Sequence, residues 1–482
     1  MAENKKLSVV LTSKENFIWE SMQEIVPFIE KNWVDSQSDR HEVRVVDVDQ
    51  TPFPEILSTV FCADNIVLSC FTLKLAKIAL VARQTLGVEA RFFIYLHNQA
   101  TIGCWPLREW GPGNILLSRD VFVSSCTRDA VTLGLSVENA RVEVLPFSFL
   151  NVSEIASAKK RRSIEPLLFS IGRISPQKNI HTLIYSLDFL KRRHGLAPRL
   201  KIFGGEDHLG SPNMGIENTR YLTSLLELTK SLGLESQVEF RGHVLREKLI
   251  EEVSQTPHVF VSASLHSDEN FGMAAFRSLV LGNKAVLSRW GGHVDFQEHF
   301  PKQVALVDAR ESTSGPWIDP RELAEKMALQ ISSLGVAEAE ELPRYYRPSF
   351  IAEQVQTLAL ETVSTGEPLR YTELADQVWK NWKKYKKDSP RRCKIFSSYS
   401  DTAASAFFRG YGMRSSSEAE KYSSSRESKY APLPWIQIGE GQIRIEDPHR
   451  GLFQFHWSHE SEPGKVPEDL LARLGDLGFT LR

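Results

Sequence analysis

The feature that most constrains the fold is an alternation of short apolar runs and helical patterns, which occurs twice along the chain. The first series has six apolar runs: KLSVVLTS (6–13), HEVRVVDVD (41–49), NIVLSCF (65–71), RFFIYLHN (91–98), DVFVSSC (120–126) and RVEVLPF (141–147). Helical patterns lie between them, for example over residues 15–33 and 73–85. Strands that alternate with helices predict parallel βαβ units with both sheet faces covered.

A second series of the same kind follows residues 153–166, which are polar and basic and are expected to form a linker. Its apolar runs are 167–174, 199–206, 237–244, 258–264 and 284–290, and its helical patterns are 179–193, 219–234, 248–255 and 272–281. We therefore predict an α/β protein with two doubly wound Rossmann-like domains, at residues 1–152 and 167–335. Ligands of such sheets bind beyond the carboxyl ends of the strands, so a cleft between the domains would collect both sets of strand ends.

The last third of the chain has a different pattern. We expect C-terminal helices over residues 336–395, a serine-rich connection over 396–430 and a small β-containing segment over 431–482. In that last segment WIQIGEGQIRIED (435–447) predicts a β-hairpin. The basic run 378–394 interleaves Trp379 and Trp382 with lysines, which would suit an anionic membrane surface. The favoured alternative is a helix that packs its aromatic side chains on the N-terminal domain and keeps its lysines in water.

Charge and composition exclude several classes of protein. The 482 residues contain 58 Lys and Arg against 60 Asp and Glu, so net charge gives no case for nucleic acid binding. No apolar run approaches the roughly 20 residues of a transmembrane helix, and the N-terminal apolar stretch is too short for a secretory signal. Five scattered cysteines make structural zinc and a disulfide framework unlikely candidates. We expect a cytoplasmic protein, with a peripheral membrane location as the alternative.

The segment FSIGRISPQKN (169–179) is the first that carries chemistry. A predicted strand ends at Gly172, and Arg173 and Lys178 then bracket a loop that opens a helix. Two cations beside a helix N-terminus are a natural diphosphate site, because backbone N–H groups and the helix dipole add to their charges. A solvated loop with two surface cations is the alternative.

The second such segment is SLHSDENFGMAAFRSLVLGNKAVLSRWGG (264–292). Glu269 precedes a helix that starts near Gly272, where a glycine lets a ligand approach the backbone closely. The backbone N–H groups of Phe271, Gly272 and Met273 would face an anion or sugar hydroxyls. An ordinary helix–strand unit with Gly282 as its C-cap would explain Gly282, but not Glu269 and Asn270 before the helix.

Other motifs are weaker. Asp47 and Asp49 resemble a metal-binding pair, but they terminate a strand, and we expect no metal site. The absence of G-x-G-x-x-G after a first strand disfavours a dinucleotide oxidoreductase, and no Walker lysine motif is present. No serine–histidine–acid grouping can be read from the sequence.

These segments together resemble the donor-binding domain of family 4 glycosyltransferases, which have the two-domain GT-B fold. The resemblance covers roughly 6–335 and rests on GRISPQKN, LKIFGGED (200–207), YLTSLLELTKSLGLESQVEFRGHV (221–244), HVFVSASLHSDENFGM and GNKAVLSRWGG. It implies a retaining, metal-independent glycosyltransferase with no cofactor, which moves a sugar from a nucleotide sugar to a hydroxyl of a carbohydrate, lipid or protein. A catalytically degenerate binding or assembly subunit is the alternative function, and a phosphorylase would need a cofactor lysine that cannot be located.

The resemblance also implies roles for individual residues. Arg173 and Lys178 would neutralise the departing diphosphate, and Glu269 would accept hydrogen bonds from the donor sugar. The remaining donor-site residues would be Gly172, Val244, Asn270, Phe271, Gly272, Met273 and Arg277. His97, at the end of the fourth strand, would reach the reaction centre from the acceptor side.

Two positions depart from the family pattern. Arg277 stands where the family usually has a second glutamate that binds the nucleotide ribose, and an arginine cannot accept a hydroxyl hydrogen bond. The ribose contact must therefore be absent or rebuilt. Residues 12–15, Thr-Ser-Lys-Glu, replace the glycine-rich loop that is common after the first strand.

Overall fold

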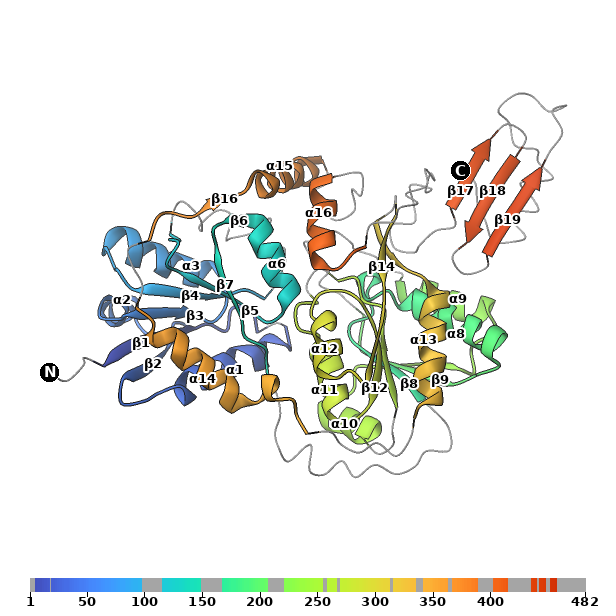
Figure 1. The fold of residues 1–482 in the computed structure, drawn as a ribbon, viewed down its shortest axis with the longest axis horizontal. Helices are drawn as coiled ribbons and strands as arrows, with labels where there is room; N and C mark the ends of the chain where they lie inside the picture. The colour runs from blue at the N-terminus through green and yellow to red at the C-terminus, as the bar shows by residue number, and fades with distance from the viewer. Residues whose placement is uncertain are drawn as a thin grey trace.

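A computed structural model of the 482-residue chain provides the three-dimensional structure. It describes residues 5–17, 19–97, 115–148, 167–206, 221–254, 258–266, 269–312, 315–334, 341–362, 366–388, 402–414, 435–439, 442–447 and 451–456. The predicted linker 153–166 lies outside these residues. Figure 1 shows two α/β domains side by side, with a small separate sheet near the C-terminus.

The first domain is built on a six-stranded parallel sheet with the order β2-β1-β3-β4-β5-β7. Its strands are β1 (Lys6–Thr12), β2 (His41–Asp47), β3 (Asn65–Leu68), β4 (Arg91–Tyr95), β5 (Val121–Ser124) and β7 (Arg141–Val144). Its helices are α1 (Met22–Asp35), α2 (Phe53–Phe61), α3 (Leu73–Leu80), which continues as a π-helical turn (Val81–Thr85), and α6 (Thr127–Ser136). Every residue of β3, β4 and β5 is buried, as expected for parallel strands covered on both faces.

The second domain is built on another six-stranded parallel sheet, with the order β10-β9-β8-β11-β12-β13. Its strands are β8 (Leu167–Ile171), β9 (Arg199–Phe203), β10 (Val238–Gly242), β11 (Val259–Ser262), β12 (Lys284–Ser288) and β13 (Val304–Val307). Its helices are α8 (Ile180–His194), α9 (Tyr221–Ser231), α10 (Arg246–Ser254), α11 (Met273–Val280), α12 (His293–His299) and α13 (Pro320–Ser332). The hairpin β14 (Ala309–Ser312) and β15 (Gly315–Ile318) follows β13. The predicted α/β fold of two Rossmann-like domains is therefore confirmed.

The two sheets differ in where the strand order reverses. In the first sheet β1 and β3 flank the reversal, and in the second sheet β8 and β11 flank it. Loops at this switch point leave a crevice at the carboxyl ends of the strands, where open α/β sheets bind ligands. The loops after β1, β8 and β11 are therefore the ones that matter for function.

Helix α1 begins later than the sequence predicts. The pattern indicated a helix from about residue 15, whereas α1 starts at Met22, and residues 13–17 and 19–21 are not helical. Asp49 holds the start of this loop, because its Oδ2 atom accepts hydrogen bonds from the Lys14 backbone N–H (2.7 Å) and the Ser13 hydroxyl (3.3 Å). The Phe17 N–H donates to the Lys14 carbonyl and the Met22 N–H donates to the Trp19 carbonyl, each at 2.9 Å, so the chain forms two turns before the helix begins.

The chain returns to the first domain after α13. Helix α14 (Pro348–Leu360) packs beside α1, and the Lys6 ammonium donates to the Leu360 and Glu361 carbonyls at its end. The Glu361 carboxylate also pairs with Arg141 (2.7 Å) and Arg91 (3.3 Å) at the edge of the first sheet. Strand β16 (Arg370–Tyr371) then pairs with β6 (Val137–Glu138), so the C-terminal helices begin on the first domain.

Helix α16 (Thr402–Tyr411) is a correction to the predicted serine-rich connection over 396–430. The apolar side chains of Phe407, Phe408 and Tyr411 are buried in the core of the second domain, and this burial stabilises the helix. The same helix packs against α6 of the first domain (Figure 1). The serines at 415–417 and 423–425 lie outside the described residues.

Helix α15 (Glu373–Asp388) contains most of the basic run. Val378 and Trp379 are buried in the same core cluster as α16, and α15 contacts both α16 and α6. Membrane contact through 378–394 therefore remains a hypothesis. Across the described residues, none of the helices combines the length and the apolar character that a bilayer crossing requires.

The C-terminal segment forms a three-stranded antiparallel sheet of β17 (Trp435–Gly439), β18 (Gln442–Asp447) and β19 (Gly451–His456). The predicted hairpin is β17 and β18, and the sequence analysis missed β19.

Candidate functional site

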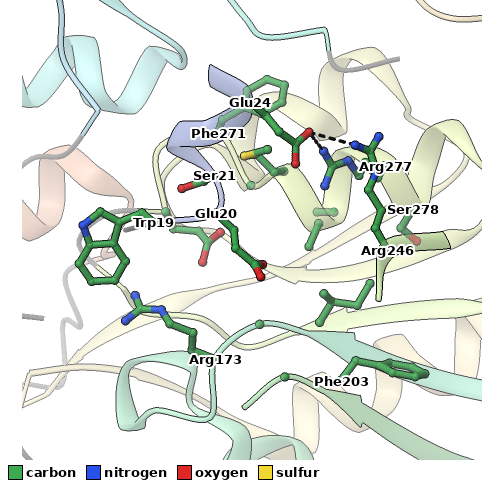
Figure 2. A pocket seen from close by; sticks show the side chains of 18 of the residues that line it. Trp19, Glu20, Ser21, Glu24, Arg173, Phe203, Arg246, Phe271, Arg277 and Ser278 are labelled. Carbon is green, nitrogen blue, oxygen red and sulfur yellow. Dashed lines mark hydrogen bonds and ion pairs between the residues drawn. The ribbon is translucent and has the colours of Figure 1, made fainter. Parts of the chain in front are cut away.

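A cleft with a volume of about 1160 Å³ lies between the two domains. Its walls come from the loop after β1, the loops after β8 and β11, and helices α1, α10 and α11. The predicted residues Gly172, Arg173, Lys178, Val244 and Arg277, residues 269–273, and His97 all line it. The fold thus brings these residues from two domains to one place, and Figure 2 shows part of their arrangement.

Two glycines let the backbone pack tightly at the carboxyl ends of β8 and β9. Gly204 has a φ of +147°, and a Cβ atom at this position would lie 1.9 Å from the Gly172 carbonyl oxygen. The Gly172 N–H donates to the Phe203 carbonyl at 2.9 Å. This close approach holds the loop that carries Arg173 and Lys178 against the end of the sheet, at the switch point.

Lys178 and Glu269 form the central ion pair of the site. The Lys178 ammonium lies 2.5 Å from Glu269 Oε2, which also accepts a hydrogen bond from the Ser264 hydroxyl at 2.6 Å. The two residues come from the loops after β8 and β11, the strands that flank the switch point. Burial alone would raise the pKa of Glu269, but Lys178, His293 and the hydrogen bonds hold it well below its usual value. Glu269 is therefore an ionised carboxylate in a largely buried place.

Arg173 lies beside a neutral histidine and an indole ring. Its guanidinium is 3.4 Å from His266 Nε2 and 4.8 Å from the centroid of the Trp19 ring. Burial and the charges of Lys178 and Arg173 lower the pKa of His266 well below its usual value. Trp19 reaches Arg173 from the loop after β1 of the other domain (Figure 2), a cation–π contact that the sequence analysis did not foresee. The only signal was an aromatic residue in a segment expected to be helical.

A second layer of contacts supports the Glu269 loop. The Gly292 N–H donates to the Glu269 carbonyl at 2.7 Å, and the Trp290 indole N–H donates to the His266 carbonyl at 2.8 Å. The Gly291 N–H in turn donates to the Tyr411 carbonyl of α16 at 2.9 Å. The C-terminal helix therefore braces the loop after β12, which braces the loop that carries Glu269.

The start of α11 has the geometry that the sequence predicts. Gly272 has a φ of +82°, and a Cβ atom there would lie 2.9 Å from the His293 ring. Asn270 and Phe271 are buried, while Met273 is partly exposed at the first turn. The Phe271 ring packs on Phe147 of the first domain, with ring centroids 5.3 Å apart. Phe271 thus contributes a core side chain and an interdomain contact as well as its place on the cleft wall.

His97 lines the cleft from the first domain. Its Nε2 atom lies 2.8 Å from the Ser69 carbonyl oxygen, and burial lowers the pKa of His97 to about 4. Because a carbonyl oxygen only accepts, Nε2 carries the proton and Nδ1 is an acceptor. Nδ1 accepts no hydrogen bond from the residues that the structure describes.

Arg277 is paired with a carboxylate of the first domain. Its guanidinium binds Glu24 Oε2, and the Arg246 guanidinium lies 3.6 Å from the same oxygen. Glu24 is on α1, Arg246 on α10 and Arg277 on α11, so the ion pairs cross the cleft (Figure 2). No local pattern around residue 24 pointed to this contact.

Asp47, the last residue of β2, and Asp49, two residues further on, form ion pairs with lysines. Asp49 lies 2.5 Å from the Lys74 ammonium, and Asp47 lies 3.3 Å from that of Lys14. Within the described ranges, no group of three His, Cys, Asp or Glu side chains has an arrangement that suits a metal ion.

The protein thus has two α/β domains with a cleft between them. Arg173 and Lys178, at the switch point of the second sheet, form a cationic corner of this cleft. Residues 152–315 match the family model described as "Glycosyl transferases group 1". This match covers the segment with Arg173, Lys178, Glu269 and Arg277, and it does not extend to the first domain or to the C-terminal helices.

Curated relatives match a similar share of the chain. Mannosylfructose-phosphate synthase of Agrobacterium fabrum (strain C58 / ATCC 33970) is 31% identical over 146 residues, which are 28% of this chain and 30% of that protein. Probable sucrose-phosphate synthase 4 of Oryza sativa subsp. japonica is 28% identical over 147 residues, or 30% of this chain and 13% of that protein. The chain thus spans less than a third of the length of these relatives.

Solved structures also match part of the chain, at low sequence identity. Anabaena Alr3699/HepE in complex with UDP has a TM-score of 0.48 and 16% identity, and the comparison covers 73% of this chain and 94% of that one. Sucrose-phosphate synthase from Thermosynechococcus elongatus has a TM-score of 0.44 and 14% identity, with 74% and 97% of the chains covered.

Proposed function

We propose that this protein is a retaining, metal-independent glycosyltransferase that moves a sugar from a nucleoside diphosphate sugar to a hydroxyl acceptor. The observation that carries the proposal is the meeting of Arg173, Lys178 and Glu269 at the switch point of the second sheet, inside an interdomain cleft. These residues lie in the segment that is similar to group 1 glycosyltransferases. Two cations and an ionised carboxylate suit a donor with an anionic diphosphate and a neutral, hydroxyl-rich sugar.

The two cations would meet the charge that develops on the departing diphosphate. Breaking the bond between the anomeric carbon and the phosphate oxygen leaves negative charge on that oxygen and an oxocarbenium-like sugar. Lys178 is partly buried, and its Glu269 partner keeps a second acceptor oxygen. Lys178 can therefore contact the phosphate while it stays beside Glu269, and Glu269 can accept hydrogen bonds from sugar hydroxyls.

The first domain would complete the reaction centre. His97 is a neutral imidazole at physiological pH, and we assign its Nδ1 atom to a hydroxyl of the donor sugar or of the acceptor. Closing the cleft would exclude water and so limit hydrolysis of the donor. Contacts that join the closed domains include Phe147 on Phe271 and the Thr127 N–H on Asp295 Oδ2 at 2.8 Å.

The first experiment is a donor screen of the full chain by thermal shift and mass spectrometry. UDP-, GDP-, ADP-, CMP- and dTDP-sugars are offered one at a time, because a ligand that binds only the native state raises the melting temperature. We expect a shift with one donor and its loss in Arg173→Ala and Glu269→Ala. Arg44→Ala is the control, because Arg44 forms an exposed ion pair with Glu42 away from the cleft.

Acceptors are then sought with that donor, and sugar phosphates are included because the relatives' names are those of sugar-phosphate synthases. A wild-type protein that neither binds nor hydrolyses any of these donors would contradict the proposal. That result would favour a glycosyltransferase-like binding or assembly subunit. Transfer with inversion at the anomeric carbon would overturn the retaining mechanism alone.

A further inference from the structure

One carboxylate of the first domain extends into the half of the cleft that the second domain forms. Glu24, on α1, binds Arg277 of α11 and lies 3.6 Å from Arg246 of α10. All three residues line the same cleft as Arg173 and Lys178. Two arginines from two helices thus hold one glutamate in a defined position across the domain boundary (Figure 2).

One of the two carboxylate oxygens of Glu24, Oε1, is available to a ligand. Both arginines contact the Oε2 atom, and the Oε1 atom accepts no hydrogen bond within the described part of the chain. The side chain is 28% exposed, so a ligand in the cleft can reach it. An ionised carboxylate has lone pairs on both oxygens and accepts only, so its natural ligand is a hydroxyl or an N–H donor.

The surroundings indicate which part of a ligand this oxygen would meet. Arg277 lies between one and two turns along α11 from Gly272, and the glycine lies next to the cationic corner where the diphosphate would bind. Leu249, Ile250 and Ala274 add apolar wall near the arginines. A ribose beside a diphosphate offers two neighbouring hydroxyls, and acidic side chains recognise ribose hydroxyls in Rossmann-like domains.

We propose that Glu24 Oε1 accepts a hydrogen bond from the ribose of the nucleoside diphosphate and that Arg246 and Arg277 position Glu24 for this contact. The proposal rests on the proposed function. Its consequence is that the nucleoside touches both domains at once, because the carboxylate comes from α1 and its anchors come from α10 and α11. Ribose recognition is then coupled to closure of the cleft, since the contact forms only when the ion pairs do.

The experiment measures ribose preference in the full-length protein. Isothermal titration calorimetry with UDP, GDP and ADP, each beside its 2′-deoxy and 3′-deoxy counterpart, gives a ratio of affinities for each nucleotide. For the nucleotide that binds, we expect the ribose form to bind about tenfold more tightly than at least one deoxy form. Glu24→Met, which keeps the length of the side chain without a carboxylate, should reduce the ratio to less than about threefold.

Two further variants keep the test decisive. Glu30→Met removes a carboxylate from the same helix outside the cleft lining and should retain the wild-type ratio. The exchange Glu24→Arg with Arg277→Glu puts the carboxylate on α11 and should restore a ribose preference that Glu24→Met lacks. Circular dichroism and a thermal melt of each variant establish that it is folded.

Each outcome either supports or overturns the inference. A wild-type protein with no ribose preference would overturn it, as would a Glu24→Met variant that binds more weakly but keeps the wild-type ratio. The second result would make Glu24 an interdomain latch only. Tighter binding of the nucleotides by Glu24→Met would also overturn the inference, because the arginines would then be a site for ligand anions with Glu24 as their counterion. Failure of the wild-type protein to bind UDP, GDP and ADP, together with failure of every sugar donor in the screen, would overturn the proposed function itself.

Discussion

The loops after β1 and β8 occupy equivalent places in the two domains, at the switch points of sheets with closely related strand orders. Both loops bring cations to the ends of the strands. In the first domain Lys14 of the loop after β1 pairs with Asp47, and Lys74 of α3 pairs with Asp49 beside it; all four side chains are at least partly exposed. In the second domain Arg173 and Lys178 face the cleft, beside His266 and Glu269.

The difference lies in what stands at the end of the neighbouring strand. Strand β2 ends at Asp47, and this residue and Asp49 just beyond it neutralise the two lysines. Strand β9 ends at Phe203 and is followed by Gly204, which has no side chain and lets the Gly172 loop pack against it. The same topology therefore gives a stabilising ion-pair cluster in one domain and a cationic corner in the other. The chemistry depends on a few residues at strand ends and not on the fold itself.

The largest expected effect comes from removing one cation from each loop. Lys178→Met should lower the rate of sugar transfer or donor hydrolysis by about 10²–10³-fold, because a fixed charge near the leaving group is lost. Lys14→Met, its counterpart in the loop after β1, should leave the rate within about twofold, because Lys14 pairs with Asp47 outside the cleft lining. Initial rates at saturating donor check both. Similar rate losses in the two variants would mean that the loops do not differ in function.

The close approach of Gly204 to Gly172 gives the next effect. Gly204→Ala should lower the free energy of unfolding by about 3 kcal/mol, because the added Cβ meets a backbone carbonyl and the residue has a positive φ. In the first domain Gly134→Ala, inside α6 with open space around it, should stabilise the protein by up to about 1 kcal/mol. Urea titration of both variants is the measurement. A neutral Gly204→Ala would show that the loop relaxes freely.

A smaller effect should appear on acidification. Burial lowers the pKa of His181 in the second domain to about 3, while the unfolded chain takes up this proton near pH 6.5. Because the unfolded state then binds more protons, stability is full above pH 6.5 and falls by about 1.4 kcal/mol per pH unit from pH 6.5 towards pH 3.

The matched test replaces one buried and one exposed histidine of the same helix. His181→Gln should unfold with a shallower dependence on pH between 6.5 and 4.5 than the wild type, whereas His194→Gln, at the exposed end of α8, should follow the wild type. Denaturant titrations at several pH values supply the slopes. Equal slopes for all three proteins would remove His181 as a source of acid sensitivity.

The sheets could be predicted because the signal for each strand lies in the strand's own residues. Strands buried on both faces leave continuous apolar runs, so β3, β4, β8 and β12 are readable from their own residues. The placement of Gly172 and Lys178 in a strand-to-helix loop also follows from a contiguous segment. Strand β13 was missed because its four residues, Val-Ala-Leu-Val, carry little signal of their own.

The contacts between domains could not be predicted in this way. Glu24 and Arg277 are 253 positions apart in the sequence, and no residue near either of them predicts their contact. Trp19 was assigned to a helix because its surroundings are compatible with helix, whereas Asp49 holds the chain in a loop before α1 begins. Helix α16 was not predicted because its segment was assigned to a serine-rich connection, whereas the helix is stabilised by burial against Trp290.

The contact between α16 and Trp290 also determines when the second domain can complete its folding during synthesis. Trp290 is fully buried beneath Phe408 and Tyr411, with ring centroids 5.8 and 5.2 Å away. As the chain leaves the ribosome, the sheet of the second domain is complete well before these two aromatic residues emerge. Until then the apolar side chain of Trp290 is exposed, and exposed apolar surface promotes misfolding and aggregation. The second domain therefore completes its core only when the last residues of α16 have been made. A chain shortened before residue 402 should consequently aggregate and should not give a smaller folded protein.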